Sequence, residues 1–166
     1  EAGLSLDFWI YHTQLSEMEK IAMTLPELSI ILNHIGGPIH LGEYEGKQAL
    51  THREWRKAMM RLSRLPNIKV KLGGLGMEVN GAKFHLNQNP PNSSQLADIW
   101  KSWIYETIDM FGVERCMFES NFPVDKGSCS YGSLWNAFKI ISENMSDNEK
   151  NKLFYENAAK TYKIKL

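Results

Sequence analysis

Two histidines stand directly after apolar segments of the sequence. His34 follows the run Ile30-Ile31-Leu32 closely, and His12 follows Phe8-Trp9-Ile10-Tyr11. Imidazole is the side chain that most readily moves a proton or binds a metal near neutral pH. Two glycines follow His34 and let a ligand approach the backbone closely. We predict that His34 is functional. His12, or Tyr11 as a substrate-binding residue, is a second candidate, and buried structural side chains are the alternative.

Further polar groups follow the third and fourth apolar runs. Asn121 and Asp125 follow the fourth. The carboxylate of Asp125 can accept a proton, whereas an amide has no state that titrates near neutral pH. Lys71 shares a predicted strand with Lys69, so both side chains point to the same face. If the strand belongs to a barrel and Lys71 faces its interior, Lys71 requires a carboxylate partner and is a candidate substrate-binding residue. If Lys71 faces outward, its side chain lies along the helices. The alternative for Asp125 is a turn or a helix cap.

The elements that position these side chains alternate along the chain. Short apolar runs predict the strands Leu4–Ile10, Leu28–Asn33, Ile68–Leu72 and Arg115–Phe118. Amphipathic helical patterns follow them, with predicted N-terminal caps at Ser16, Thr51, Asn92 and Ser146. This alternation predicts an α/β fold with a parallel sheet and right-handed crossovers.

The loops narrow the architecture. Connections from strand to helix are long and rich in His, Asn, Asp and Gly, while connections from helix to strand, such as Leu25-Pro26-Glu27, are short. A TIM barrel has this asymmetry because its active site lies in the loops after the strands, and an open doubly wound sheet has it too. A complete flavodoxin-like domain is therefore an alternative, and it predicts a reversal in the strand order.

The composition excludes several kinds of partner. Nineteen basic residues balance nineteen acidic ones, so no electrostatic footprint indicates nucleic acid or an anionic membrane. No apolar stretch approaches the roughly 18 residues of a membrane span. The segment Gly73-Gly74-Leu75-Gly76 lacks the spacing of a nucleotide-binding fingerprint, so no nucleotide is expected.

Cys116 and Cys129 are predicted to be reduced thiols in a cytoplasmic protein. Arg115 and the histidines at 40, 52 and 85 are expected at the surface.

Three segments together carry a resemblance to a known family. They are Asn33-His34-Ile35-Gly36-Gly37-Pro38, Val70-Lys71-Leu72-Gly73-Gly74-Leu75-Gly76-Met77, and Phe111-Gly112 with Met117-Phe118-Glu119-Ser120-Asn121-Phe122-Pro123-Val124-Asp125. In this order they resemble the amidohydrolase-2 family of TIM-barrel hydrolases and lactonases. The resemblance implies that residues 1–166 are a single partial domain, the C-terminal half of a (β/α)8 barrel with strands five to eight. Half a barrel leaves two unpaired edges, so we expect the isolated polypeptide to be inactive and to dimerise or dissolve poorly.

The same resemblance implies roles for individual residues. In metal-dependent members, histidines after strands five and six bind a divalent metal, which here implies His12 and His34 with zinc or manganese. The matching histidine can instead donate to a substrate carbonyl. The family usually has an aspartate at the mouth of strand eight, where this chain has Asn121. Asn121 is therefore expected to orient water or substrate, while Asp125 or Glu119 takes the proton.

The implied function is hydrolysis of a carbonyl compound, either a lactone or a small amide or ester, by attack of water. A small-molecule substrate and a homo-oligomer are expected. One alternative is a catalytically silent barrel that binds a metabolite, with Asn121 marking the lost base. The other is a related decarboxylase.

Overall fold

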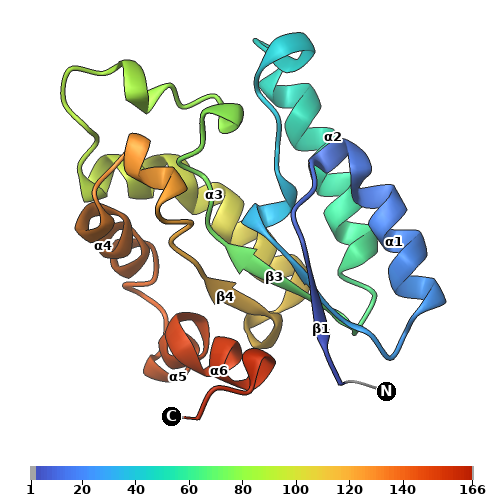
Figure 1. Cartoon of the computed structure of the whole chain (residues 1–166). Coiled ribbons are helices and arrows are strands. Elements are labelled where there is room, and N and C mark those ends of the chain that lie inside the picture. Colours follow the sequence, from blue (N-terminus) through green and yellow to red (C-terminus); the bar gives the residue numbers. More distant parts are fainter. Residues whose placement is uncertain (1–2, 166) are drawn as a thin grey trace.

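A computed structural model of the chain describes residues 3–165 and contains one parallel sheet. Its strands are β1 (Ser5–Phe8), β2 (Ser29–Leu32), β3 (Ile68–Leu72) and β4 (Cys116–Phe118). They lie side by side in chain order, β1-β2-β3-β4, as Figure 1 shows. The order has no reversal, so the flavodoxin-like alternative is wrong. The predicted strands are confirmed; β3 has the predicted bounds, and the other three strands are one to three residues shorter in total than predicted.

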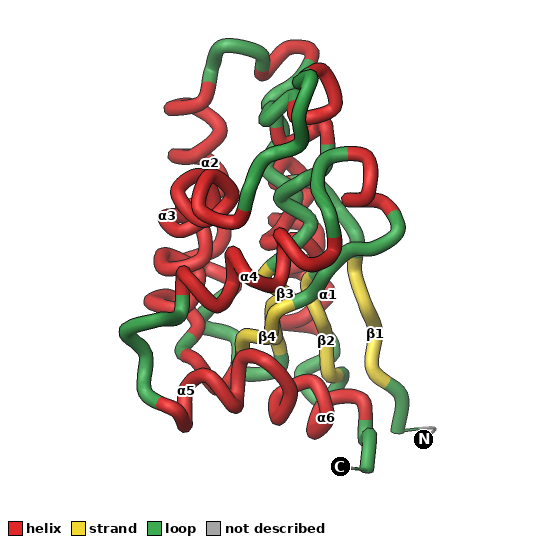
Figure 2. Tube along the Cα trace, turned by 90° about the vertical axis from the view of Figure 1, so that its left-hand side faces the viewer, coloured by secondary structure: helices red, strands yellow, loops and turns green. Residues whose placement is uncertain are grey.

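Helices cover one face of the sheet, with α2 and α3 on one side of the strands (Figure 2). The helices are α1 (Leu15–Thr24), α2 (Gln48–Leu62), α3 (Ser93–Phe111), α4 (Tyr131–Ile141) and α5 (Asp147–Asn151), which continues through a π-helical turn, Lys152–Glu156, into α6 (Asn157–Tyr162). Side chains of β3 alternate between the two faces, and Ile68, Val70 and Leu72 are fully buried against the helices. Trp55 and Trp100 fill the same core, so most of its apolar area lies between the sheet and the helices.

The opposite face of the sheet carries charged side chains. Lys69 and Lys71 of β3 share this face, as the strand period predicts. The ammonium of Lys71 lies 2.6 Å from the Asp7 carboxylate, and the Lys69 ammonium donates to the hydroxyl of Thr161 at 2.9 Å. Tyr162, at the end of α6, donates to Asp7 at 2.7 Å. The last helix thus crosses the amino-terminal end of this face and ties it to β1.

Two of the four predicted helix caps are confirmed. Asn92 and Ser146 each accept a backbone N–H three residues on, and Gln95 and Glu149 reach back reciprocally. The prediction for Ser16 is wrong, because α1 already begins at Leu15.

The other two corrections concern residues that contact distant backbone. Helix α2 begins at Gln48, so Thr51 is not its cap; the Thr51 hydroxyl instead donates to the carbonyl of Ile39, which the loop after β2 brings alongside. Arg115 precedes β4 rather than starting it, and it does not form a surface pair. Its guanidinium donates to backbone carbonyls at the ends of α2 and α3, those of Ser63, Leu65 and Phe111.

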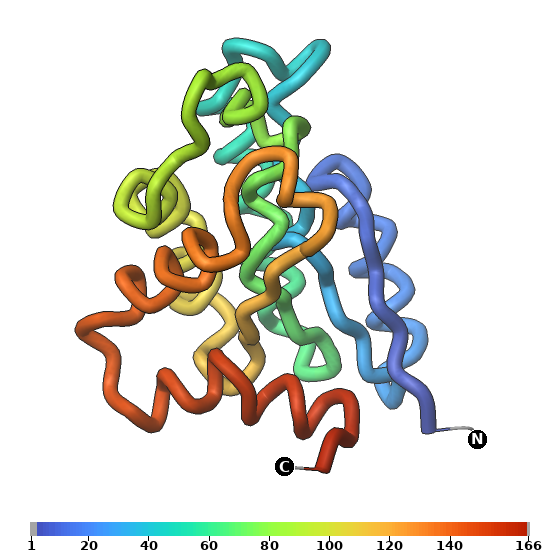
Figure 3. The backbone as a smooth tube through the Cα atoms, turned by 60° about the vertical axis from the view of Figure 1, so that its left-hand side comes forward, coloured from blue at the N-terminus to red at the C-terminus, as the bar shows by residue number. Residues whose placement is uncertain are grey.

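The strands carry their loops to one end of the molecule. Figure 3 shows the segments after β2, β3 and β4 gathered at the end opposite to both termini. In parallel sheets this carboxyl edge is where ligands bind. Within residues 3–165, no helix has the length and apolarity needed to cross a membrane.

Candidate active site

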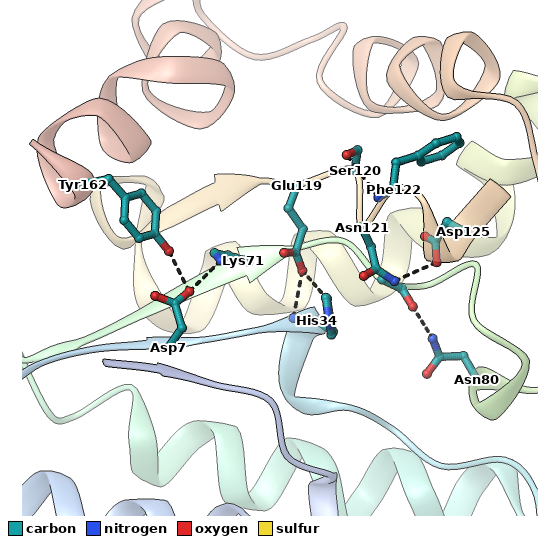
Figure 4. Close-up of polar contacts among 11 residues, drawn as sticks. Asp7, His34, Lys71, Asn80, Glu119, Ser120, Asn121, Phe122, Asp125 and Tyr162 are labelled. Carbon is teal, nitrogen blue, oxygen red and sulfur yellow. Dashed lines mark hydrogen bonds and ion pairs between the residues drawn. The ribbon is translucent and has the colours of Figure 1, made fainter. Parts of the chain in front are cut away.

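His34 and Glu119 meet at the carboxyl edge, each just past the end of its strand. One carboxylate oxygen of Glu119, Oε1, accepts the backbone N–H of His34 at 2.9 Å and lies 2.5 Å from ring atom Nδ1 (Figure 4). Their side chains are 12% and 15% exposed, so the pair is largely shielded from water. Strands β2 and β4 are separated by β3, and the loops alone bring the two residues together.

The backbone at this edge is strained. His34, Ile35 and Asn121 have φ values of 55°, 53° and 52°, in the left-handed region that non-glycine residues rarely adopt. The carbonyl of Ile35 accepts the indole N–H of buried Trp55 at 2.7 Å, which helps to hold the turn. Strain of this kind is concentrated at functional sites because the surrounding structure must enforce it.

Two glycines after β3 make room for the pair. A β-carbon on Gly74 would lie 2.6 Å from ring atoms of His34, and one on Gly73 would collide with the carbonyl oxygen of Glu119. Gly74 also has a φ of +67°. The glycine-rich segment is therefore a tight turn beneath the two side chains.

Asp125 lies beside this pair and is almost completely buried. The side-chain amide of Asn121 donates to its Oδ1 at 2.8 Å, while Oδ2 has no hydrogen-bonding partner among the described residues. Burial raises the pKa of Asp125 to about 6, against the opposing contacts with the Asn121 amide and the Gly76 backbone. A carboxylate with this pKa is a better proton acceptor than an ordinary aspartate and is still ionised at neutral pH.

A pocket of about 430 Å³ opens next to these residues. Its walls come from the loops after β1, β3 and β4, and include Trp9, Tyr11, Gly76, Met77, Val124 and Ser128. The ring of Trp9 packs edge-on against His34 with centroids 4.5 Å apart, and a β-carbon on Gly76 would touch the Asp125 carboxylate at 3.0 Å. Tyr11 therefore lines the pocket, whereas His34 and Asp125 lie behind its wall, next to Trp9 and Gly76.

Lys71 lies apart from this pocket, on the charged face of the sheet. Burial lowers its pKa, but hydrogen bonds to Asp7 and Tyr162, together with the charge of Glu119, outweigh burial and the pKa is raised overall. Burial also raises the pKa of Tyr162 to about 12, so its hydroxyl stays protonated and donates to Asp7. Lys71 has the carboxylate partner that a barrel interior requires, and its substrate-binding role stays a prediction.

His12 is buried in a different group of contacts. Its Nδ1 accepts the backbone N–H of Ile39 at 3.3 Å, its Nε2 lies 3.7 Å from Glu54, and its ring packs against Tyr44. Burial lowers the pKa of His12, which favours the neutral ring. Residues 3–165 contain no group of three or more His, Cys, Asp or Glu residues placed to hold a metal. A metal shared by His12 and His34 stays a prediction.

The structure also corrects His40 and raises the importance of Glu119. His40 is buried, not at the surface: its Nδ1 lies 2.9 Å from the carbonyl oxygen of Asn80, because the loops after β2 and β3 pack together. Sequence reasoning treated Glu119 only as an alternative base. The available clue was its position, one residue past a buried strand.

Comparisons with known proteins place the chain in a family. A family model described as Amidohydrolase matches residues 1–164. Protein y4mH of Sinorhizobium fredii, described as uncharacterized, is 39% identical over 98% of this chain and 48% of its own length. L-fucono-1,5-lactonase of Burkholderia multivorans is 26% identical over 95% of this chain and 51% of its own length. The chain thus spans about half the length of the curated relatives it matches.

Solved structures show the same fold. A crystal structure of an amidohydrolase from Burkholderia multivorans with bound Zn matches with a TM-score of 0.78 at 25% identity, covering 96% of this chain and 53% of that one. A second crystal form of that protein, with bound HEPES, matches with a TM-score of 0.80 over the same shares. The chain belongs to the amidohydrolase family, as its three motifs implied.

Proposed function

We propose that this chain forms the C-terminal half of a (β/α)8-barrel hydrolase, with β1–β4 as barrel strands five to eight and residues 1–166 as one partial domain. Four βα units in sequential order support this, as does the half-length match to the relatives. In the described sheet β1 and β4 each have one neighbour, so each leaves an edge to be paired. The proposal includes a homo-oligomeric protein, which light scattering tests.

The proposed reaction is hydrolysis of a carbonyl compound in the pocket beside Asp125. The carboxylate of Asp125 takes a proton from water while the water oxygen attacks the carbonyl carbon. The carbon–oxygen or carbon–nitrogen bond then breaks, and the leaving group takes the proton back. Asn121 orients Asp125 through its amide. The observation that carries the proposal is a buried carboxylate with a pKa of about 6 and one unpartnered oxygen at the carboxyl edge.

His34 and Tyr11 are assigned to the substrate in this proposal. His34 lies at the reacting carbonyl, where its ring can exchange a hydrogen bond with the carbonyl oxygen or the attacking water. Tyr11, in the pocket wall, contacts the rest of the substrate. A lactone is the first substrate class to test, because one relative is named a lactonase. Small amides and esters follow.

The fit of a divalent metal to this chain is limited. A catalytic zinc takes three protein ligands, and the described part of the chain does not bring three together. The proposed hydrolysis therefore uses the side chains of this chain alone. Zinc or manganese in the whole protein stays part of the proposal, because a related amidohydrolase was solved with zinc. Elemental analysis of the purified protein tests it.

The decisive experiment is a hydrolysis assay with a panel of lactones, esters and amides. Asp125→Asn removes the proposed base at constant shape and should lower kcat by about 10²–10⁴-fold. Asp109→Asn, on an exposed turn of α3, is the matched control and should leave the rate unchanged. Equal rates for Asp125→Asn and the wild type would remove Asp125 from the mechanism.

A silent barrel that binds a metabolite is the second candidate, and Asn121 is the observation that favours it. Asn121→Asp separates the two. In a working enzyme it places a second carboxylate where an amide now donates to Asp125 at 2.8 Å, so activity should fall. In a silent relative it restores the family's aspartate, and activity should appear.

A further inference from the structure

Glu119 makes an unusual pair of contacts to a single residue. Its Oε1 faces both the backbone N–H and the ring Nδ1 of His34, at 2.9 and 2.5 Å. A carboxylate only accepts hydrogen bonds, and two donors converging on one oxygen satisfy it well. A lone pair on Nδ1 at this distance would instead repel the oxygen. The contact therefore requires a proton on Nδ1.

The ring of His34 cannot easily turn away from this contact. Trp9 packs edge-on against it at 4.5 Å, and Gly74 lies so close that a β-carbon there would collide with it. The backbone of His34 is held in the left-handed region, and the same carboxylate that binds the ring also binds its N–H. The ring nitrogen Nε2 forms no hydrogen bond within residues 3–165 and is not among the fully buried unpartnered atoms.

We infer that Glu119 is a positioning residue that fixes His34 in the tautomer with the proton on Nδ1. Nε2 is then the only ring nitrogen that can exchange a proton with water or bind a substrate atom. Neutral His34 presents a lone pair there, and only protonated His34 presents a donor. The inference about the tautomer does not depend on which reaction the protein catalyses. The role of Glu119 in catalysis rests on the proposed hydrolysis. A carboxylate behind a working imidazole is a known way of fixing ring orientation.

The same chain contains a second His–Glu pair with the opposite geometry. His52 on α2 contacts Glu106 on α3 through Nε2, at 2.8 Å, and Glu106 also pairs with Arg56. Its side chains are 40% and 31% exposed, far more than those of His34 and Glu119. The pair predicts a proton on Nε2 of His52. It is therefore an internal reference whose tautomer should differ from that of His34.

The test is a long-range ¹H–¹⁵N correlation spectrum of the protein labelled with ¹⁵N-histidine. At about pH 8.5 an ordinary imidazole is neutral, and its protonated and unprotonated nitrogens are distinguished by chemical shift. His34, assigned by the loss of its signal in His34→Gln, should show a protonated Nδ1. Glu119→Gln should change this pattern, whereas Glu106→Gln should change only His52. An unprotonated Nδ1 on His34 in the wild type would overturn the inference, and that outcome needs no variant to fold.

Kinetics separate this inference from the proposed function. If the protein hydrolyses one of the tested substrates, Glu119→Gln should lower kcat about 10–100-fold with KM within about twofold, and Glu106→Gln should match the wild type. Glu119→Asp keeps the charge and should recover part of the loss. A protonated Nδ1 in a protein that hydrolyses nothing contradicts the hydrolase and supports the positioning role. Full activity of Glu119→Gln, with the wild-type tautomer, removes that role.

Discussion

Two regions of the sheet hold polar groups in opposite ways. On the charged face, within the strands, Lys71 and Asp7 are paired, and Tyr162 donates to the same carboxylate. At the carboxyl end, Asp125 is buried with one oxygen unpartnered and His34 has a strained backbone. The first arrangement stabilises the fold. The second leaves polar atoms without partners among the described residues, so we expect substitutions in the two regions to affect different measurements.

The sharpest test of this difference is His34→Ala. Removing the ring should lower kcat/KM by about 10²–10⁴-fold if it contacts the reacting carbonyl. The measurement is the hydrolysis rate on the best substrate of the panel, with the folded state checked by circular dichroism. Little change in rate would place the chemistry elsewhere, and the carboxyl edge would then not differ in function from the charged face.

A smaller effect is expected from Gly74→Ala, which removes the room beneath His34. The new β-carbon would lie 2.6 Å from the ring, at a φ of +67° that alanine disfavours. We expect a loss of about 1–3 kcal/mol in the free energy of unfolding, measured with urea. Gly132→Ala is the matched control, because a β-carbon there has nothing within 4 Å and alanine favours the helix. Equal stability of the two variants would mean that the loops at the carboxyl edge shift to make room for the added β-carbon.

The sequence predicted the elements better than the contacts between them. Strand Ile68–Leu72 and the caps at Asn92 and Ser146 agree with the structure, because each is set by a short local pattern. Thr51 and His40 were misplaced because their partners, Ile39 and Asn80, come from separate loops.

In the candidate site, too, single residues could be predicted from the sequence but their contacts could not. Position after a buried strand identified His34, Asn121 and Asp125 as candidates, since parallel strands bring their carboxyl ends together. The pairing of His34 with Glu119 joins residues 85 positions apart. It depends on two strained loops and on the space left by Gly73 and Gly74. No pattern within one segment contains that information.

As the pH rises through the pKa of Asp125, the free energy of unfolding should fall while activity rises. Its pKa is raised from 3.8 to about 6 in the folded chain, so between these values the folded state binds the proton more tightly than the unfolded state. The contribution of Asp125 to the free energy of unfolding should therefore fall as pH rises from about 4 to 6, by on the order of 1–3 kcal/mol. Activity should rise with a midpoint near pH 6, because the base must be ionised.

The difference between the wild type and Asp125→Asn isolates this contribution. Urea unfolding of both at about pH 4.5 and 7.5 should show the variant gaining relative stability at the higher pH, where the wild type has a buried charge. A wild type that gains stability relative to the variant at the higher pH would mean that hydrogen bonds or charges in the folded state stabilise the carboxylate. Asp125 would then resemble the paired charges of Lys71 and Asp7.

The smallest effect is expected on the charged face, from Lys71→Met. The substitution leaves the Asp7 carboxylate with only the hydroxyl of Tyr162, and both charged side chains are partly shielded, at 20% and 33% exposure. We expect a loss of about 1–2 kcal/mol in the free energy of unfolding, less than for a fully buried pair. Lys101→Met breaks an exposed pair with Asp98 and should cost less than about 0.5 kcal/mol. Because Lys71 does not line the pocket, the kcat of Lys71→Met should remain near the wild-type value if the two regions act separately. A large loss of kcat with unchanged stability would instead make Lys71 the substrate-binding residue that the sequence suggested.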